Sequence, residues 1–417
     1  MKFFKFLAVA LVAMLGFSSC SEDCEHDFIE VDHSKDIVGT WTCLEEGFAQ
    51  AFVFNADGTA VTTGIENGKY REDVNVTWKL NNNKLTLSYG DNTSETLIDI
   101  IPGKALSIAD KDGKNRKTFQ YCANDLSDEV VGMWVCNDGL AEEENDMVIM
   151  SYSTEGKVTM TTPVSTFVPT DFVNQVFDYK VVGDLLFKIF PKENFPEGAN
   201  PYLVSRLTYS PNGTSLGDVL IENQHTPTEN GVMELTFSFL RIKQSLDLAG
   251  KKYDHIKTYV SNVKGQDKDI NFMGYTFNFA KMDGSGLDKM LKSLLFAVEF
   301  PNENTLSYSY QMNGKKEVFD APIVVEGNKM TIKMSAKVPT LKDVVLYTFQ
   351  DADCSQMHFY MHKTAFVNFY TNMQAMLLAG TNDQFDITNA EAVNAIYESI
   401  NSAVETINVS LVMTKSK

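Results

Sequence analysis

The sequence has few of the residue types that usually carry catalysis or bind metals. It holds six histidines and six cysteines in 417 residues, and no two cysteines stand in the Cys-x-x-Cys spacing typical of zinc sites. It contains neither a Walker phosphate-binding loop nor a His-Glu-x-x-His zinc motif. We therefore predict no catalytic residue, no bound metal and no cofactor, and we expect a protein that is not an enzyme.

Long apolar runs and net positive charge are also lacking. Beyond the first twenty residues, no apolar run is long enough to span a bilayer. The formal net charge is −19 at pH 7, and a surface of that sign repels phosphate backbones. The composition therefore predicts a soluble body that does not bind nucleic acid.

The N-terminus has the order of an export signal. Two lysines precede an apolar stretch over residues 6–15, which is too short for a membrane span. Residues 16–20 read Gly-Phe-Ser-Ser-Cys, which resembles the lipobox of bacterial lipoproteins. The resemblance implies that residues 1–19 are a signal peptide and that Cys20 carries lipid such as palmitate, which attaches the chain to a membrane. The alternative is an ordinary secretory signal with an incidental cysteine.

Residues 20–35 form an acidic stretch that cannot bury a core. No lysine or arginine stands between Cys20 and Lys35, so this stretch is predicted to be a flexible tether. It resembles the acidic export tag that follows the lipidated cysteine in surface lipoproteins of the Bacteroidota. The resemblance implies an outer-membrane anchor with the body exposed on the cell surface. A periplasm-facing anchor with a solvated tether is the alternative.

One short pattern recurs along the chain. Residues 37–43 read IVGTWTC and residues 130–136 read VVGMWVC, and a fainter third copy over residues 246–253 reads LDLAGKKY. Each copy opens a run of short alternating strands. This internal repeat predicts three related β-meanders.

The strands that follow each copy end at turn residues. Asp57 and Gly58 stand between two apolar alternating runs, which is a strong hairpin signal. About eight strands fit into the first repeat, enough to close a small barrel. The predicted fold is all-β, built from repeated antiparallel barrels or meanders, and repeats two and three form either two separate barrels or one domain. The predicted boundaries are residues 36–124, 125–245 and 246–417.

A few helices are expected in the third repeat. Apolar residues recur at helical spacing over residues 287–296, 365–378 and 389–404, and Thr388 or Asn389 can cap the last helix. We expect these helices to pack against a sheet or to close one end of a barrel. A lid over a ligand pocket is the sharper alternative.

The Gly-x-Trp pattern that opens the first two repeats resembles that of lipocalins and other calycins. In that family the tryptophan closes one end of the barrel and packs against a basic residue near the last strand. The resemblance implies this role for Trp41 and Trp134, and the whole chain resembles the lipocalin-like lipoproteins of gut Bacteroidota. The third repeat departs from the pattern, because Lys252 or Tyr253 stands where the tryptophan would be. The candidate basic partners are Arg116 or Lys117 for Trp41, and Arg241 or Lys243 for Trp134.

Export would permit disulfide bonds between the remaining cysteines. Cys43 lies in the first strand of repeat one and Cys122 in its last, and these strands are neighbours in a closed meander. A Cys43–Cys122 bridge is therefore geometrically plausible, Cys136 and Cys354 could form a second pair, and Cys24 is left over. Free buried thiols are an equally weighted alternative.

Three weaker patterns have ordinary structural explanations. His358 and His362 share one face of a predicted strand, but about 13 Å separates them, too far for one metal ion unless the segment were helical. Residues 110–113 resemble the start of a calcium loop but lack the later acidic ligand, so a hairpin turn is expected. Residues 213–217 match the letters Gly-x-Ser-x-Gly, yet a strand follows where a nucleophile elbow requires a helix.

Aromatic and sulfur-containing residues are plentiful in the third repeat. They cluster over residues 272–279 and 359–370, where core packing is the default explanation. We predict non-catalytic binding of a small apolar or amphipathic ligand, of lipid, bile-acid or haem type, with repeat three and its helices forming the pocket. The alternative function is a surface module that binds glycan or protein without an enclosed pocket.

Overall fold

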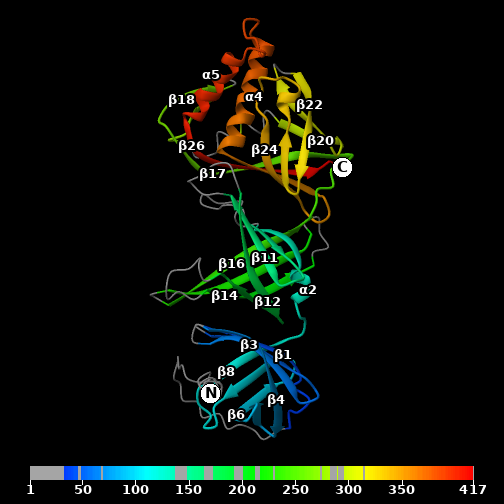
Figure 1. Cartoon of the computed structure of the whole chain (residues 1–417), viewed down its shortest axis with the longest axis vertical. Coiled ribbons are helices and arrows are strands. Elements are labelled where there is room, and N and C mark those ends of the chain that lie inside the picture. The colour runs from blue at the N-terminus through cyan, green and yellow to red at the C-terminus, as the bar shows by residue number, and fades with distance from the viewer. Residues whose placement is uncertain are drawn as a thin grey trace.

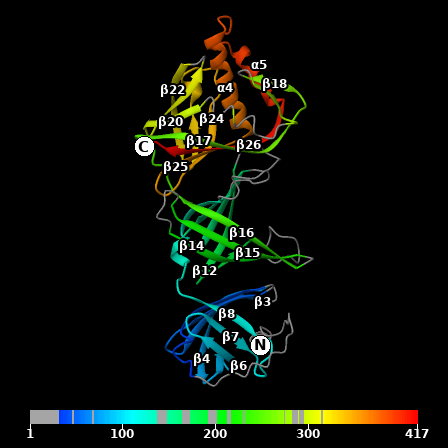
Figure 2. The ribbon, with the colours of Figure 1, turned by 180° about the vertical axis from the view of Figure 1, so that it is seen from behind.

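The chain folds into three closed eight-stranded antiparallel barrels that stand in a row along the long axis (Figure 1). We describe a computed structural model, and Figure 2 shows the same row from behind. The predicted all-β fold with an internal repeat is confirmed. The structure describes residues 32–45, 48–66, 69–136, 148–163, 172–191, 201–211, 217–228, 231–272, 275–281, 289, 295–312 and 315–416.

The first barrel closes by pairing its first strand with its last. Trp41 stands opposite Tyr121 in that ladder, and the hairpin expected at Asp57 and Gly58 joins the second strand to the third. The strands are β1 (Gly39–Glu45), β2 (Phe48–Phe54), β3 (Thr59–Glu66), β4 (Lys69–Asn81), β5 (Lys84–Tyr89), β6 (Asn92–Ile101), β7 (Ala105–Ala109) and β8 (Lys117–Cys122).

A short helix, α2 (Ser127–Val130), leads into the second barrel. This barrel again runs up and down and closes between its first and last strands, where Trp134 stands opposite Arg241. It is therefore separate from the third. Its strands are β9 (Gly132–Cys136), β10 (Ile149–Tyr152), β11 (Lys157–Pro163), β12 (Phe172–Val182), β13 (Leu185–Ile189), β14 (Tyr202–Ser210), β15 (Val219–Thr228) and β16 (Gly231–Ile242).

The third barrel has the same order of pairing but carries insertions. A hairpin of β18 (Asp269–Phe272) and β19 (Tyr275–Asn278) stands between its first two strands, and the 3₁₀ turn η3 (Met334–Ala336) precedes its sixth. The barrel strands are β17 (Lys251–Gly265), β20 (Leu295–Asn302), β21 (Thr305–Met312), β22 (Lys315–Glu326), β23 (Lys329–Ile332), β24 (Val344–Gln350), β25 (Gln356–His362) and β26 (Val404–Lys415).

Two helices, α4 (Lys363–Thr381) and α5 (Ala390–Asn401), are inserted between β25 and β26, close to where the sequence predicts them. Asn389 caps α5, because its side chain accepts hydrogen bonds from the first backbone amides of the helix. Most of the helix expected over residues 287–296 lies outside the described residues, and its last two residues belong to β20 instead. Among the described residues, no helix is long and apolar enough to cross a membrane.

The two Gly-x-Trp copies have the same local structure. Trp41 and Trp134 are both fully buried. The Nε1 of Trp41 donates to the carbonyl of Ile37 at 2.7 Å, and that of Trp134 donates to the carbonyl of Val130 at 2.8 Å. Each indole thereby ties the segment before the first strand to the end of its barrel.

The partner of each tryptophan comes from the last strand of its barrel. The guanidinium of Arg241 lies 4.4 Å from the ring centroid of Trp134, so the basic partner predicted there is present. At Trp41 the ring of Tyr121 takes this place, edge-on at 5.0 Å. The alternative candidate Lys117 lies instead over the ring of Phe48.

The glycine two residues before each tryptophan leaves space for the side chain that packs against the indole ring. Gly132 has φ +130°, and a Cβ there would lie 2.9 Å from Nη1 of Arg241. We expect Gly132→Ala to lower the free energy of unfolding of the second barrel by about 2–3 kcal/mol, because it adds a clash to an unfavourable backbone angle. Gly250→Ala is the control, since φ there is +72° but nothing lies within 4 Å of the added Cβ, and it should cost only about 1 kcal/mol. Equal losses in denaturant midpoint for the two variants would contradict the clash.

The outer faces of neighbouring barrels pack against each other. An apolar cluster joins the first barrel to the second, and another joins the second to the third. Between barrels one and two, Thr42 Oγ1 donates to Asp184 Oδ1 at 2.6 Å, and Arg206 pairs with Asp184 and donates to Thr42. The first cluster consists of Ala49, Ala51, Leu185, Phe187 and Val204. The second consists of Val135, Ile149, Leu240, Ile242, Phe349 and Tyr360.

Candidate functional site

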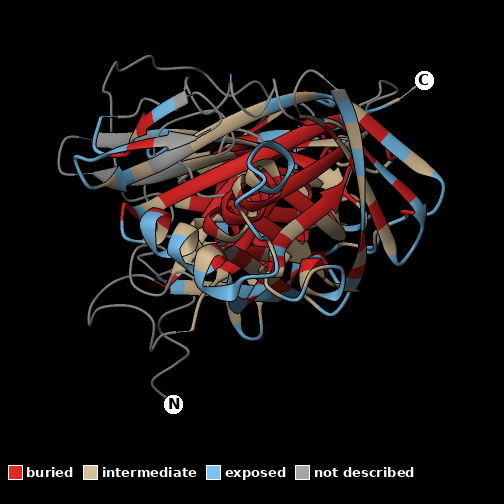
Figure 3. Ribbon diagram, turned by 90° about the horizontal axis from the view of Figure 1, so that it is seen from above, coloured by how far each residue is buried: buried red, intermediate tan, exposed pale blue. Residues whose placement is uncertain are grey.

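An apolar cavity lies inside the third barrel. Its volume is about 50 Å³, enough for a few heavy atoms and several times the space that one water needs. Viewed along the long axis, buried residues gather at the centre of the molecule and exposed ones at its rim (Figure 3). The lining residues are Leu295, Val298, Leu306, Tyr308, Ile332, Met334, Val344, Leu346, Phe359, Met361, Phe369, Asn372, Met373 and Leu411.

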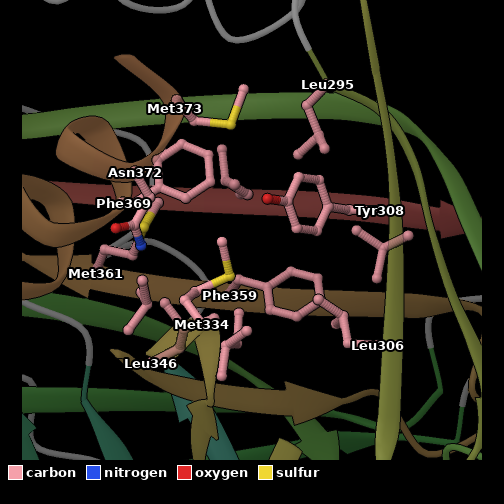
Figure 4. Close-up of a pocket in the computed structure, with 14 residues that line it drawn as sticks. Leu295, Leu306, Tyr308, Met334, Leu346, Phe359, Met361, Phe369, Asn372 and Met373 are labelled. Carbon is pink, nitrogen blue, oxygen red and sulfur yellow. The ribbon is translucent and has the colours of Figure 1, made fainter. Parts of the chain in front are cut away.

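The period of two in the strands produces this lining. On β24, Val344 and Leu346 point inward while Val345 between them is 40% exposed. On β25, Phe359 and Met361 point inward in the same way. Side chains from six strands therefore converge on one space (Figure 4).

Helix α4 supplies one wall of the cavity. It packs against β24, β25 and β26 and contributes Phe369, Asn372 and Met373 to the lining. Two asparagines attach it to the segment before β24. Asn372 accepts from the amide of Lys342 at 2.9 Å and donates to its carbonyl at 2.7 Å, and Asn368 donates to the carbonyl of Asp343 at 2.8 Å. These hydrogen bonds fix the helix to the barrel. They also turn the amide of Asn372 toward the backbone of Lys342, so the surface of the cavity stays apolar.

The lining of the cavity is chemically uniform. None of the fourteen lining residues is an acid, a base, a histidine or a cysteine. Burial raises the pKa of Tyr308 well above its usual value, so its hydroxyl stays neutral at any physiological pH. Met334, Met361 and Met373 add flexible, polarisable side chains that can adapt to a guest.

The interior of the first barrel is filled by large side chains. Phe52 stacks on Phe54 at 5.4 Å, and Phe54 meets the ring of Trp78 edge-on at 5.9 Å. Phe119 of β8 contacts Phe52 of β2, with 5.4 Å between the ring centroids. This barrel therefore has the packed interior expected from its short strands.

The interior of the second barrel contains a buried ion pair. Lys188 and Glu222 are 5% and 0% exposed and are bonded to each other, and Ser205 and Gln224 donate to the same carboxylate at 2.8 and 2.6 Å. Burial alone would raise the pKa of Glu222, but these three donors together lower it below its usual range. Burial also raises the pKa of Tyr152, whose hydroxyl has no hydrogen-bond partner among the described residues. This cluster was not predicted from the sequence. Lys188 nevertheless follows the inward-facing Leu186 by two residues, which places both on the same face of β13.

Of the two alternatives for the cysteines, the predicted disulfides are wrong and free thiols are found among the described residues. Cys20 and Cys24 lie outside the described residues, and none of the four described cysteines is in a disulfide. Thr40 stands opposite Cys122, so Cys43 is about 10 Å further along β1 and faces the other side of the sheet. Cys43 belongs to the core of the first barrel, and burial raises the pKa of Cys122 to about 11.

The second suggested pair, Cys136 and Cys354, does not form either. Cys136 belongs to the interior of the second barrel. Cys354 lies in the turn between β24 and β25 of the third barrel, where its Sγ is 3.8 Å from Asp247. The two thiols thus belong to different barrels.

The two histidines of β25 do not form a metal site. His358 faces away from the cavity and stacks on Phe349 at a centroid distance of 4.5 Å. Burial lowers the pKa of His358 to about 3, and it also lowers the pKa of His362. In the described part of the chain, no group of three His, Cys, Asp or Glu side chains could hold a metal ion.

The calcium-loop pattern does not form the site that it resembles. Asp110 accepts from the backbone amides of Asp112 and Lys114, so residues 110–113 form a turn closed by its own side chain. Most of residues 213–217 lies outside the described residues.

The aromatic clusters seen in the sequence divide between cavity and core. Phe359 and Phe369 line the cavity. Phe366 packs instead against Phe279 beside the β18–β19 hairpin, at 6.2 Å between ring centroids. The cavity lies in the third repeat, where the sequence predicts the pocket. Asn372 was not predicted as a lining residue, because only the position of α4 brings it to the barrel.

The comparisons with known proteins give only distant likenesses. No family model and no curated protein matches the chain. Transferrin-binding protein B of Haemophilus parasuis is 11% identical over 89% of this chain and 66% of that chain, with a TM-score of 0.23. The transferrin-binding protein B of Neisseria meningitidis is 10% identical over 89% and 66%, with a TM-score of 0.20. A porin-like protein from Bacteroides uniformis is 10% identical over 48% of this chain and 94% of that chain, with a TM-score of 0.13.

Proposed function

We propose that this protein is a non-catalytic binding protein for a small apolar or amphipathic ligand, held inside the third barrel. The observation that carries the proposal is the cavity, which is lined by apolar side chains in a barrel of eight strands. Apolar surfaces lined by few polar groups are typical of small-molecule sites. The absence of charged groups from the lining residues leaves burial of the ligand as the source of affinity.

The size of the cavity restricts the ligand. A volume of about 50 Å³ is well below the ~300–1,000 Å³ of typical ligand pockets. A ligand of a few carbons fits directly, and a longer acyl chain requires the lining methionines to change rotamer. A haem-like ligand is the poorest fit, because the cavity is small and no histidine or cysteine lines it.

The same proposal places the protein in the cell envelope. The export pattern and Cys20 support a lipid anchor in the outer membrane, and the acidic stretch after it supports a position on the cell surface. The Gly-x-Trp copies support a lipocalin-like origin of the barrels. The alternative of a glycan-binding platform has less support, because no aromatic side chain is exposed among those that the structure describes.

Two adjacent residues on β24 allow a matched test. Leu346→Trp fills the cavity, whereas Val345→Trp places the same side chain on the outer face. We expect a small hydrocarbon or a short-chain amphiphile to stabilise the wild type and Val345→Trp by up to about 2.7 kcal/mol at one hundred times Kd, measured as a rise in melting temperature. Leu346→Trp should show no such shift. Absence of any shift in the wild type, or an equal shift in Leu346→Trp, would overturn the proposal.

A further inference from the structure

One carboxylate oxygen inside the second barrel has no hydrogen-bond donor among the described residues. The Oε1 of Glu222 accepts from all three donors around it, Lys188, Ser205 and Gln224, and its Oε2 accepts from none of them. Glu222 is 0% exposed. Burial acts to raise its pKa, but the three donors lower that pKa below its usual range, so Oε2 belongs to an ionised group. Because a buried charged oxygen without a donor is costly, a partner for Oε2 is expected.

A second buried group without a partner faces the same interior. Tyr152 on β10 is 3% exposed, and its hydroxyl has no hydrogen-bond partner in the described part of the chain. Its ring belongs to the core cluster that includes Leu207, and Leu207 stands opposite Glu222 in the ladder. Burial raises the pKa of Tyr152, and the charge of Glu222 raises it further, so the hydroxyl is protonated and lies close to the carboxylate.

The ammonium of Lys188 has hydrogens left over as well. It carries three, and Glu222 is the one partner that the described residues give it. The interior thus offers an anionic acceptor, a hydroxyl that both donates and accepts, and further N–H donors. Since the pair of Lys188 and Glu222 is neutral overall, an added ion would bring an uncompensated charge into the barrel. A neutral group that both donates and accepts satisfies all of these atoms.

We infer that the second barrel binds one small neutral hydroxyl group, which donates to the Oε2 of Glu222 and accepts from the hydroxyl of Tyr152. That hydroxyl belongs either to an internal water molecule or to a small alcohol that takes the place of the water. A water needs only about 10–15 Å³ of space and two to four polar partners, which these side chains supply. The site is separate from the apolar cavity of the third barrel and goes beyond the proposed function.

Tyr152→Phe tests the site in the full chain, because the presence or absence of a bound hydroxyl gives effects of opposite sign. If the hydroxyl of Tyr152 donates to a bound hydroxyl, its removal should raise the equilibrium constant for unfolding about fivefold. If it has no partner, its removal relieves a buried unsatisfied group, and the constant should fall. Tyr179→Phe is the matched control, since the hydroxyl of Tyr179 donates to the carbonyl of Ser153 at 2.6 Å and its removal should also cost about fivefold.

Crystal structures of the same proteins identify the occupant. Wild-type crystals grown without alcohols should show one oxygen atom within about 3 Å of both Oε2 and the hydroxyl of Tyr152. Tyr179→Phe should keep this oxygen, and Tyr152→Phe should lose it or hold it at lower occupancy. After a soak in methanol, an unchanged single oxygen identifies water as the occupant, and density for a bonded carbon shows that an organic hydroxyl is also admitted. The inference is overturned if Tyr152→Phe does not raise the unfolding constant, or if the wild type holds an ion or no oxygen atom at this place.

Discussion

Replacing Lys188 with methionine is expected to lower the free energy of unfolding of the second barrel by about 3–5 kcal/mol. The change leaves the carboxylate of Glu222, which is 0% exposed, without its cation inside the barrel. The two remaining donors, Ser205 and Gln224, do not neutralise a buried charge. The loss can be measured as a shift in the denaturant midpoint of the second barrel.

Two further variants separate the buried charge from simple loss of packing. The double variant Lys188→Met/Glu222→Leu removes both charges and should recover most of the stability, since a well-packed apolar pair often replaces a buried ion pair without cost. Lys157→Met breaks a pair on the same barrel in which both side chains are more than half exposed, and it should cost less than about 1 kcal/mol. If Lys188→Met costs no more stability than Lys157→Met, Lys188 is not needed to compensate the buried charge of Glu222.

Acidification from pH 7 to pH 5 is expected to weaken the packing of the third barrel on the second by about 2 kcal/mol through His358 alone. Burial lowers the pKa of His358 to about 3, whereas an unfolded histidine titrates near 6.5. Below pH 6.5 the unfolded or undocked chain takes up a proton that the docked chain excludes. The stability is therefore fully present above pH 6.5 and falls as the pH decreases toward 3.

Other titratable groups at this interface act in both directions. Burial lowers the pKa of His362, which adds to the acid sensitivity. Burial raises the pKa of Asp351 to about 6, so the folded chain binds a proton more readily there than the unfolded chain and gains stability as the pH falls. Asp351 is bridged to Ile242 of the second barrel, so it titrates within the same contact.

Variants of His358 isolate its share of the pH dependence. His358→Phe keeps an aromatic ring against Phe349 and removes the titrating nitrogens. Its free energy of unfolding, obtained from denaturant titration, should fall by about 2 kcal/mol less between pH 7 and pH 5 than that of the wild type. His255→Asn changes a side chain that is 85% exposed and should behave as the wild type does. An unchanged pH dependence in His358→Phe would refute the assignment.

The sequence was sufficient for those features that depend on local pattern. Strand alternation and turn residues predicted three related barrels or meanders, and the Gly-x-Trp copies pointed to Arg241 or Lys243 as the partner of Trp134, of which Arg241 is the one found. These features follow from period-two burial and from residues close to each strand end. The third meander was predictable as well, although Tyr253 replaces the tryptophan and pairs across the ladder with Lys415; its closure into a separate barrel was left open.

Features that depend on register and on contacts between barrels could not be predicted in this way. The expected bridge between Cys43 and Cys122 fails because of a three-residue offset in one ladder. The run from Leu185 to Lys188 is buried on both faces, because its odd positions contact the first barrel and its even positions fill the second. The cavity in the third barrel reflects the summed volumes of side chains from six strands and a helix, which no local window contains.

The order of the barrels in the row also bears on how a ligand reaches the cavity. The first barrel lies at the N-terminal end of the row, and the third barrel with α4 and α5 lies at the other end (Figures 1 and 2). Apolar contacts at both junctions hold the row together. If Cys20 carries the lipid anchor proposed above, two whole barrels lie between the anchored end of the chain and the barrel that holds the cavity. A guest could then reach the cavity from the external medium without first entering the membrane.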